Sequence, residues 1–382
     1  MASLDQLLTV EGQRLLAELA GETQSAGSEL GLITRYRARY PAELVSAALS
    51  QVKLRARARA KFSLADEMYF TGSGLEQAST ERMSRYHAKR YASFGRVADL
   101  CSGIGGDLLG LASRGETLAV DLDPVHLRMG MLNARAYGVD HNVTSVQSDV
   151  RDVSLDGVDA VFIDPARRSE DRRFRAGESE PPLDWCVALA ERGLSVGIKA
   201  APGLPVDVVP EGWELEFVSE GRELKESVLW SPSLATTRRR ATILPNEHTL
   251  IESPGAALDV RGPGAFLLDP DPAVTRAGLV AELGRSLGRV WKIDDQVAFL
   301  SSDERFDTPF GRGLRIEASM PWSLKRLKES LRSLDIGTVD IRKRGSAVDV
   351  DDLQRRLKLS GARSATVVLT RVGDRPWMMV CT

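Results

Sequence analysis

The sequence predicts an α/β protein built around a mostly parallel β-sheet. Short, continuously apolar runs recur from residue 96 onward, and helix-like stretches separate the earlier ones. A run rich in β-branched and aromatic residues suits a strand that is covered on both faces. Strands that alternate with helices are typical of βαβ units, in which the helices cover the faces of the sheet.

The composition is that of a globular protein with several domains. The chain has 382 residues, of which 43% are hydrophobic and 27% charged, and this length indicates roughly two to four domains. No apolar run reaches the length of a membrane span, and the N-terminus lacks the pattern of a signal peptide. The scattered cysteines and histidines form neither a disulfide framework nor a metal spacing. We therefore expect a cytoplasmic protein without membrane contact or metal.

The expected elements follow in order. Residues 3–61 are predicted to be helical, and Pro41 precedes the last of these helices. Strands are then expected at 96–101, 117–123, 143–149, 159–164 and 194–200, with helices at 106–115 and 124–138 between the first three. The runs at 213–220, 226–231 and 238–244 follow with little helix between them, which predicts an antiparallel edge.

The C-terminal part is expected to contain smaller α/β units. Residues 244–264 are rich in proline and glycine and are typical of a loop-rich boundary. A strand at 265–269, a helix at 272–287 and a strand at 296–302 come next, followed by strand 314–319, helix 323–334, strand 338–344, helix 349–359 and a hairpin at 364–381. The predicted domains are 1–65, 66–245, 246–313 and 314–382.

A glycine loop follows the first strand of the sheet, in the stretch "VADLCSGIGGDLLGLA" (97–112). Gly103 and Gly105 allow a tight turn, and the next helix is expected to open at about Asp107. A dinucleotide-binding loop would carry a third glycine where this chain has Leu108. The turn alone is weak evidence for any ligand.

Successive strands each end in an aspartate, namely Asp99, Asp121, Asp149 and Asp164. Each acid alone could cap a helix, but parallel strands bring all four to one edge of the sheet, where open α/β sheets bind ligands. Asp121 stands where a carboxylate can hold a ribose hydroxyl pair, and Asp149 could accept from an adenine amino group. All four together are hard to explain as helix caps.

The order Asp99–Gly103–Gly105, Asp121, Asp149, Asp164-Pro165 resembles the class I S-adenosylmethionine-dependent methyltransferases. "DLCSGIGGD" and "AVDLDPVHLRMGMLNARAYGV" are similar to RNA methyltransferases of the trimethylguanosine synthase type, and residues 339–372 resemble a THUMP-like domain. The resemblance covers roughly residues 70–382. It implies a Rossmann-like doubly wound sheet, preceded by a helical region and followed by ferredoxin-like and THUMP-like units.

The same resemblance implies S-adenosyl-L-methionine as the cofactor. The implied cofactor-binding residues are Gln77, Ser79, Asp99, Cys101, Gly103, Gly105, Asp107, Asp121, Leu122, Asp149, Val150 and Asp164. Cys101 departs from the family, which has a glycine there, and we interpret it as a packing residue rather than a nucleophile.

The motif at the fourth strand end also departs from the family. Amine-methylating relatives have Asn or Asp, then Pro-Pro and an aromatic residue, whereas this chain has Asp164-Pro165-Ala166-Arg167. Asp164, Pro165 and Arg167 are the expected catalytic residues: Asp164 would orient the acceptor, and Arg167 or Arg168 would stack on the target base. Arginines 172, 173 and 175 would then meet phosphates. Alternatively, these arginines pair with Glu170 and Asp171 in an exposed loop, or the missing ring marks a core that no longer methylates.

The leading hypothesis is a methyltransferase acting on a base nitrogen in tRNA or rRNA. Because the net charge is −2, RNA binding would depend on local basic clusters at 53–61, 167–175, 238–240, 323–332 and 342–344, each of which could also be a solvated face. The alternatives are a methyltransferase for a small molecule or protein and a catalytically silent RNA-binding module.

Overall fold

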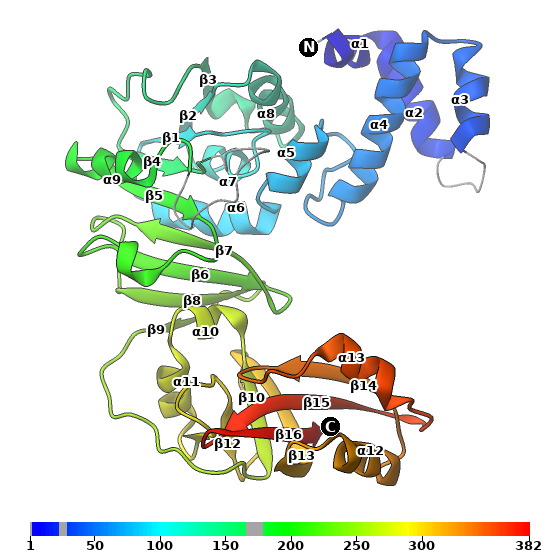
Figure 1. Cartoon of the computed structure of the whole chain (residues 1–382). Coiled ribbons are helices and arrows are strands. Elements are labelled where there is room, and N and C mark those ends of the chain that lie inside the picture. The colour runs from blue at the N-terminus through cyan, green and yellow to red at the C-terminus, as the bar shows by residue number, and fades with distance from the viewer. Residues whose placement is uncertain (1, 23–28, 166–178) are drawn as a thin grey trace. The chain divides into compact units, whose positions relative to one another are not determined.

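The computed structural model describes residues 2–22, 29–165 and 179–382 (Figure 1). It divides into two compact units, which are described separately. The first comprises residues 1–200 and 229–234, and the second comprises residues 201–228 and 235–382. The domain boundaries predicted from the sequence remain a prediction.

The first unit begins with a cluster of helices, as the sequence predicts. These are α1 (Ala2–Leu8), α2 (Val10–Glu22), α3 (Glu29–Arg37) and α4 (Ala42–Ala58). Pro41 is the N-cap of α4, a position where its missing N–H costs no hydrogen bond. The cluster is held together by buried apolar side chains such as Leu15, Leu19 and Val45. This core also includes Ile104 of the glycine loop, so the helices pack directly against the predicted site.

The sheet of the first unit is parallel. Its strands are β1 (Arg96–Leu100), β2 (Glu116–Asp121), β3 (Val143–Gln147), β4 (Ala160–Ile163) and β5 (Ser195–Ala200). They lie in the order β3-β2-β1-β4-β5, so the chain builds outward on one side of β1 and then returns to its other side. The predicted α/β class and these predicted strands are confirmed. A topological switch point therefore lies between β1 and β4, where such sheets form a ligand crevice.

Helices cover this sheet. They are α5 (Gly72–Gln77), α6 (Glu81–Ala88), α7 (Leu108–Ala112), α8 (Pro124–Ala136) and α9 (Leu183–Glu191), with short 3-10 helices at Lys89–Tyr91 and Asp140–Asn142. α8 packs against β2 and β3, and α9 packs against β5. Leu108, Ala119 and Leu127 join α7, β2 and α8 in one apolar cluster. Covering both faces leaves the carboxyl edge of the sheet as the place for polar groups.

The second unit starts with strands at the edge predicted to be antiparallel. They are β6 (Glu214–Glu220), β7 (Glu223–Trp230), β8 (Arg239–Leu244) and β9 (His248–Ile251), in the order β7-β6-β8-β9, and a 3-10 helix covers Val206–Val208. β8 and β9 are antiparallel, but β6 and β8 are parallel, so the prediction was wrong for that pair. The reason is that Gly221 and Arg222, both with positive φ, turn the chain before β7, and a second reversal before β8 restores the direction of β6.

The C-terminal part of the second unit is a mixed sheet with helices. Its strands are β10 (Phe266–Pro270), β11 (Trp291–Lys292), β12 (Leu300–Ser302), β13 (Gly311–Pro321), β14 (Ile336–Lys343), β15 (Arg363–Val372) and β16 (Arg375–Cys381), in the order β11-β12-β10-β13-β16-β15-β14. Its helices are α10 (Pro272–Arg276), α11 (Val280–Leu287), α12 (Leu324–Ser333) and α13 (Val350–Leu357). The single helix predicted at 272–287 is two helices, because Gly278 has φ +70° and ends the first one.

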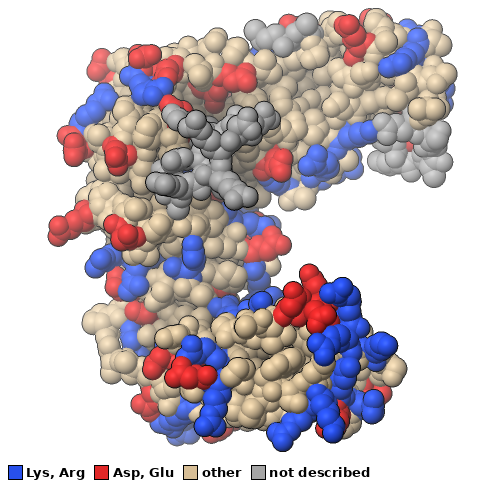
Figure 2. Space-filling model, in the orientation of Figure 1, with Lys and Arg blue, Asp and Glu red and all other residues tan. Residues whose placement is uncertain are grey.

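Successive side chains of β15 point to opposite faces of this sheet. Val367 packs on the face that also contains Leu327 of α12 and Leu353 of α13. Val368 packs on the other face with Phe299. The outer surfaces of α12 and α13 carry charged residues, and Figure 2 shows Lys and Arg side chains on this part of the unit with Asp and Glu side chains beside them.

Among the described residues, no helix is long and apolar enough to cross a membrane. The same residues hold no group of three or more His, Cys, Asp or Glu side chains arranged for a metal ion.

Candidate active site

The strand ends of the first unit bring the predicted acids to one edge of the sheet. Leu100 of β1 is in register with Val120 of β2 and Ile163 of β4. Just beyond these pairs, the Asp164 N–H donates to the Leu100 carbonyl at 3.2 Å. Asp99, Asp121 and Asp164 therefore end neighbouring strands, as expected for parallel pairing.

The glycine loop is tied to Asp121. The Gly103 N–H donates to Oδ2 of Asp121 at 2.7 Å, and the Asp123 N–H donates to Oδ1 at 2.8 Å. Gly103 has φ +55°, and a Cβ there would meet nothing within 4 Å. Gly105 has φ +91°, and its Cβ would lie 3.1 Å from Gly130 Cα in α8. The second glycine thus allows close packing on α8, whereas the first faces open space.

Cys101 holds a backbone conformation that side chains rarely adopt. Its φ of +63° lies in the left-handed region, which explains why the family uses glycine at this position. Burial, with the nearby Asp121 and Asp164, raises the pKa of the thiol. The thiol is therefore protonated at neutral pH and is not an activated nucleophile.

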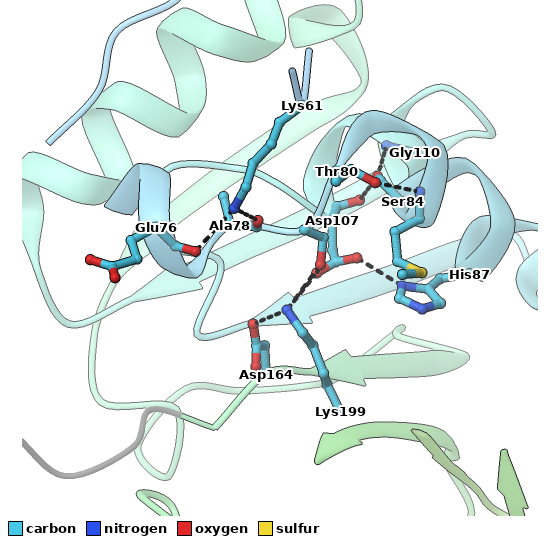
Figure 3. Close-up of polar contacts among 12 residues, drawn as sticks. Lys61, Glu76, Ala78, Thr80, Ser84, His87, Asp107, Gly110, Asp164 and Lys199 are labelled. Atoms are coloured by element: carbon cyan, nitrogen blue, oxygen red, sulfur yellow. Dashed lines mark hydrogen bonds and ion pairs between the residues drawn. The ribbon is translucent and has the colours of Figure 1, made fainter. Parts of the chain in front are cut away.

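Asp107 is the centre of a buried polar network (Figure 3). Its Oδ2 accepts from the Ser79 hydroxyl at 2.6 Å, and its Oδ1 lies 2.8 Å from Nδ1 of His87. The His87 ring is buried against Phe162, with ring centroids 4.9 Å apart. Ser84 adds a further contact, because its hydroxyl donates to the Asp107 carbonyl at 2.9 Å.

Lys199 joins this network to Asp164. It lies near the end of β5, and its Nζ is 2.7 Å from Oδ2 of Asp164 and 2.9 Å from the Ser79 hydroxyl. Oδ2 of Asp107 is 3.8 Å from the same ammonium. The Lys199 side chain is 13% exposed and that of Asp164 is 33% exposed, so the carboxylate is the more accessible member of the pair.

The sequence analysis missed Lys199 and His87. A sequence signal existed for Lys199, because "SVGIKA" has one charged residue near the end of an apolar strand, just as the four acids stand at the ends of the other strands. No comparable signal marked His87, which lies in the basic, polar stretch of α6.

The acids of the site differ in charge state. Burial opposes ionisation of Asp107, but Lys199 and His87 outweigh it and lower the pKa of Asp107 to about 2. Asp99 is 1% exposed, and its Oδ2 has no hydrogen-bond partner among the described residues. Burial, together with Asp107 and Asp164, raises the pKa of Asp99 well above its ordinary value. Burial therefore favours the neutral form of Asp99, beside an ionised Asp107.

The other predicted cofactor residues stand apart from this network. Asp149 accepts from the main chain and the guanidinium of Arg151 at 2.6–2.9 Å, and these contacts lower the pKa of Asp149 to about 2. Val150 beside it is buried, and the exposed Gln77 ends α5. Pro165 follows Asp164 directly and is half-buried, whereas Arg167 and the rest of the 167–175 cluster lie outside the described residues.

The residues present fit S-adenosylmethionine, the cofactor that the resemblance implies. Gly103 leaves open space beside Asp121, whose carboxylate can accept from ribose hydroxyls. Leu122 is 68% exposed, and an apolar side chain in that position suits the face of an adenine ring. The ionised carboxylate of Asp107 suits the cationic amino group of the cofactor.

Several of the predicted basic clusters contribute to internal contacts. The Lys61 ammonium donates to the carbonyls of Leu75, Glu76 and Ala78 at the end of α5. Arginines of two other clusters form ion pairs, Arg240 with Glu214 at 2.6 Å and Arg344 with Asp269 at 2.9 Å. The 323–332 cluster differs, because its Lys325, Arg326 and Arg332 are exposed on α12.

Parts of the chain match known protein families, and the whole fold matches a solved structure. A family model described as RNA cap guanine-N2 methyltransferase matches residues 94–177, one described as THUMP domain-like matches residues 311–382, and one for a domain of unknown function matches residues 1–58. A crystal structure from Porphyromonas gingivalis W83, named as a methyltransferase, covers 97% of this chain and 98% of its own with a TM-score of 0.77. At 20% identity it shows the fold alone, and it confirms the predicted Rossmann-like fold class.

Closer sequence relatives show the family. Uncharacterized S-adenosylmethionine-dependent methyltransferases of Mycobacterium tuberculosis, from strains CDC 1551 and H37Rv, are 38% identical over 314 residues. The alignment covers 80% of this chain and 85% of each relative. With this identity over most of both chains, and with a strand-end site that fits the cofactor, the chain belongs to the S-adenosylmethionine-dependent methyltransferases.

Proposed function

We propose that this enzyme methylates a base nitrogen in tRNA or rRNA and that Asp164 orients the acceptor. The observation that carries the proposal is the Asp164 carboxylate itself. It ends β4 beside the strand from which the glycine loop leaves, and it is one-third exposed where Asp99 and Asp107 are buried. A partly exposed carboxylate at this point can accept a hydrogen bond from an amine while it keeps its contact with Lys199.

Two family matches support RNA as the substrate. The match to the RNA cap guanine-N2 methyltransferase model spans the glycine loop, Asp121, Asp149 and Asp164, and the acceptor in that description is an exocyclic base amine. The THUMP domain-like match covers α12, where Lys325, Arg326 and Arg332 are exposed cations suited to phosphate contact. These residues carry no information about base sequence, so the nucleotide would be selected near Asp164.

The chemistry asked of the chain is mainly positioning. When bound, S-adenosylmethionine supplies an electrophilic methyl group on a sulfonium. Asp164 would accept an N–H of the acceptor amine, so that the nitrogen lone pair is directed away from the carboxylate. Correct orientation of two reactants accounts for up to about 7–11 kcal/mol of a barrier. The nitrogen must also lose a proton as the new bond forms, and an ionised Asp164 is within reach to take it.

The remaining predicted residues would hold the cofactor. Asp121 would accept from the ribose hydroxyls and Asp149 from the adenine amino group, with Leu122 and Val150 beside the ring. Gln77, Ser79, Asp99 and Asp107 would face its amino-acid end, and Cys101, Gly103 and Gly105 would shape the loop beneath it. Arg167 as a stacking residue stays part of the proposal.

The test compares RNA nucleosides from cells with and without the gene by mass spectrometry. One methylated nucleoside should disappear on deletion and return with the wild-type gene, but not with Asp164→Ala, which removes the acceptor atoms. The matched control is Asp159→Ala, since Asp159 lies at the opposite end of β4 and accepts from the Gly95 and Arg96 N–H groups. The control should restore the nucleoside. An unchanged nucleoside profile after deletion would remove RNA as the substrate, and full complementation by Asp164→Ala would remove the role of Asp164.

A further inference from the structure

We propose that Lys199 is a positioning residue for methyl transfer: its ammonium holds the Asp164 carboxylate ionised and in place, and it restricts the acceptor to an electrically neutral group. This inference rests on the proposed function, in which Asp164 orients the acceptor. Nothing in the family matches assigns a role to Lys199, because the methyltransferase match ends at residue 177.

Adjacent parallel strands fix the pair in space. Ile163 of β4 is in register with Ile198 of β5, so Asp164 and Lys199 are the next residues on neighbouring strands. The Nζ–Oδ2 distance of 2.7 Å is that of a strong, charge-assisted hydrogen bond. Because both residues are positioned by rigid strands, the ammonium is held beside Asp164 before any ligand binds.

The other contacts of Lys199 anchor it from the opposite side. Its Nζ is 2.9 Å from the Ser79 hydroxyl, which in turn donates to Asp107. Asp107 does not depend on Lys199 for hydrogen bonds, because Ser79 and His87 already contact its two oxygens. Of the two ion pairs that the ammonium forms with these acids, the shorter is with Asp164, the more accessible of the two.

The electrostatic surroundings explain why Asp164 needs this cation. Among the described residues, the titratable groups around the pair are Asp99 and Cys101 of the β1 end, Asp121 of the β2 end, Asp107 before α7, His87 of α6 and Tyr91. Three of these six are carboxyl groups, and any that is ionised opposes a negative charge on Asp164. Without the ammonium, Asp164 would therefore keep its proton to a higher pH.

The same charge narrows the substrate class. A cationic acceptor placed against Asp164 would also face the Lys199 ammonium a few ångströms away, and like charges repel strongly in a site of low dielectric. The exocyclic amine of a nucleobase is neutral at pH 7 and meets no such repulsion. A protein lysine or a polyamine arrives protonated and does.

The first experiment needs no substrate. Full-length protein with ¹³C-carboxyl-labelled aspartate is titrated by NMR, and the Asp164 resonance is assigned by its loss in Asp164→Asn. In Lys199→Met the Asp164 midpoint should rise by about 1–3 pH units, the effect of removing one adjacent cation. Lys199→Arg should stay near wild type, and so should the control Lys225→Met, which removes an exposed lysine paired with Glu223 on β7. If Lys199→Met does not fold, Lys199→Gln keeps hydrogen-bond donors without the charge. An unmoved midpoint in the neutral variant overturns the inference.

The second experiment measures transfer from tritiated S-adenosylmethionine to deproteinised RNA from a strain that lacks the gene. The acid limb of the rate profile should move upward in Lys199→Met by the same amount as the NMR midpoint, while cofactor affinity changes by less than about threefold. Active wild type with an unmoved limb in the variant overturns the inference. If wild type transfers nothing to RNA while the NMR shift is present, the RNA assignment fails and the role of Lys199 stands. Methylation of poly-L-lysine by wild type as fast as RNA overturns the neutral-acceptor restriction.

Discussion

Replacing Asp121 by asparagine should weaken cofactor binding far more than it weakens the fold. In the structure the two carboxylate oxygens already accept from the Gly103 and Asp123 N–H groups, which fixes the side chain beside the open face of the glycine loop. Asparagine has the same shape but only one acceptor atom and no charge. One loop N–H must then face an amide NH₂, and the ribose hydroxyls lose a charged acceptor.

The size of the effect follows from these losses. Hydrogen bonds to a charged group contribute about 1.5–3 kcal/mol, whereas neutral ones contribute about 0.5–1.5 kcal/mol. Exchanging charged for neutral contacts at the ribose, with some loss of loop order, should cost about 2 kcal/mol. That free energy corresponds to roughly a 30-fold increase in Kd.

Isothermal titration calorimetry with S-adenosylmethionine and S-adenosylhomocysteine measures this change. The matched control is Asp123→Asn, two residues away, because Asp123 caps α8 by accepting from the Val125 and His126 N–H groups, and asparagine is an equally good N-cap. The control should bind like wild type. Equal affinities in the Asp121 and Asp123 variants, with both proteins folded, would refute the assignment of Asp121 to the ribose.

Two further predictions concern stability. The pKa of Asp107 is lowered from 3.8 to about 2, so its ionised form stabilises the fold by about 2 kcal/mol above about pH 4, and this contribution is lost as the pH falls toward 2. The loss of unfolding free energy in Asp107→Asn, measured by urea unfolding, should therefore be the same at pH 7 and pH 5 and smaller at pH 3. An equal loss at all three pH values would contradict the reasoning. Cys101→Gly should relieve the strain of the left-handed backbone at φ +63° and raise the unfolding free energy by about 1 kcal/mol, or a few degrees in Tm. Cys101→Val should lower the Tm. A lower Tm for the glycine variant would show that packing of the thiol outweighs the backbone strain.

The sheet and its acids could be predicted because local pattern is sufficient for them. A continuous apolar run such as 160–163 identifies a buried strand without knowledge of its neighbours. In a parallel sheet the acids at the carboxyl ends of the strands lie at one edge. The closeness of Asp99, Asp121 and Asp164 therefore follows from the strand direction alone. The break at Gly278 and the parallel pairing of β6 with β8 could not be predicted in this way, because each depends on where the chain turns rather than on the apolar pattern.

The polar network could not be predicted, because its partners are far apart in the sequence. Lys199 meets Asp164 across 35 residues and Ser79 across 120. A lysine near a strand end is ordinarily solvated, and only the order β4-β5 of the sheet brings this one to Asp164. The same reason applies to the basic clusters, because Arg344 is bonded to Asp269, which lies 75 residues earlier in the sequence. Patterns within a window of ten residues cannot distinguish such arginines from those that remain exposed on α12.

The proposed roles divide the charged groups of the site into two parts. In the proposed nucleoside part, loop N–H groups hold Asp121 and Arg151 holds Asp149. In the proposed transfer part, burial raises the pKa of Asp99, and Lys199 is paired with both Asp107 and Asp164. Crowded carboxylates are tolerated there because burial favours the protonated form of one and the others share a cation. Variants of the first group should therefore act on cofactor affinity, and variants of the Lys199–Asp164 pair on the rate and its pH dependence.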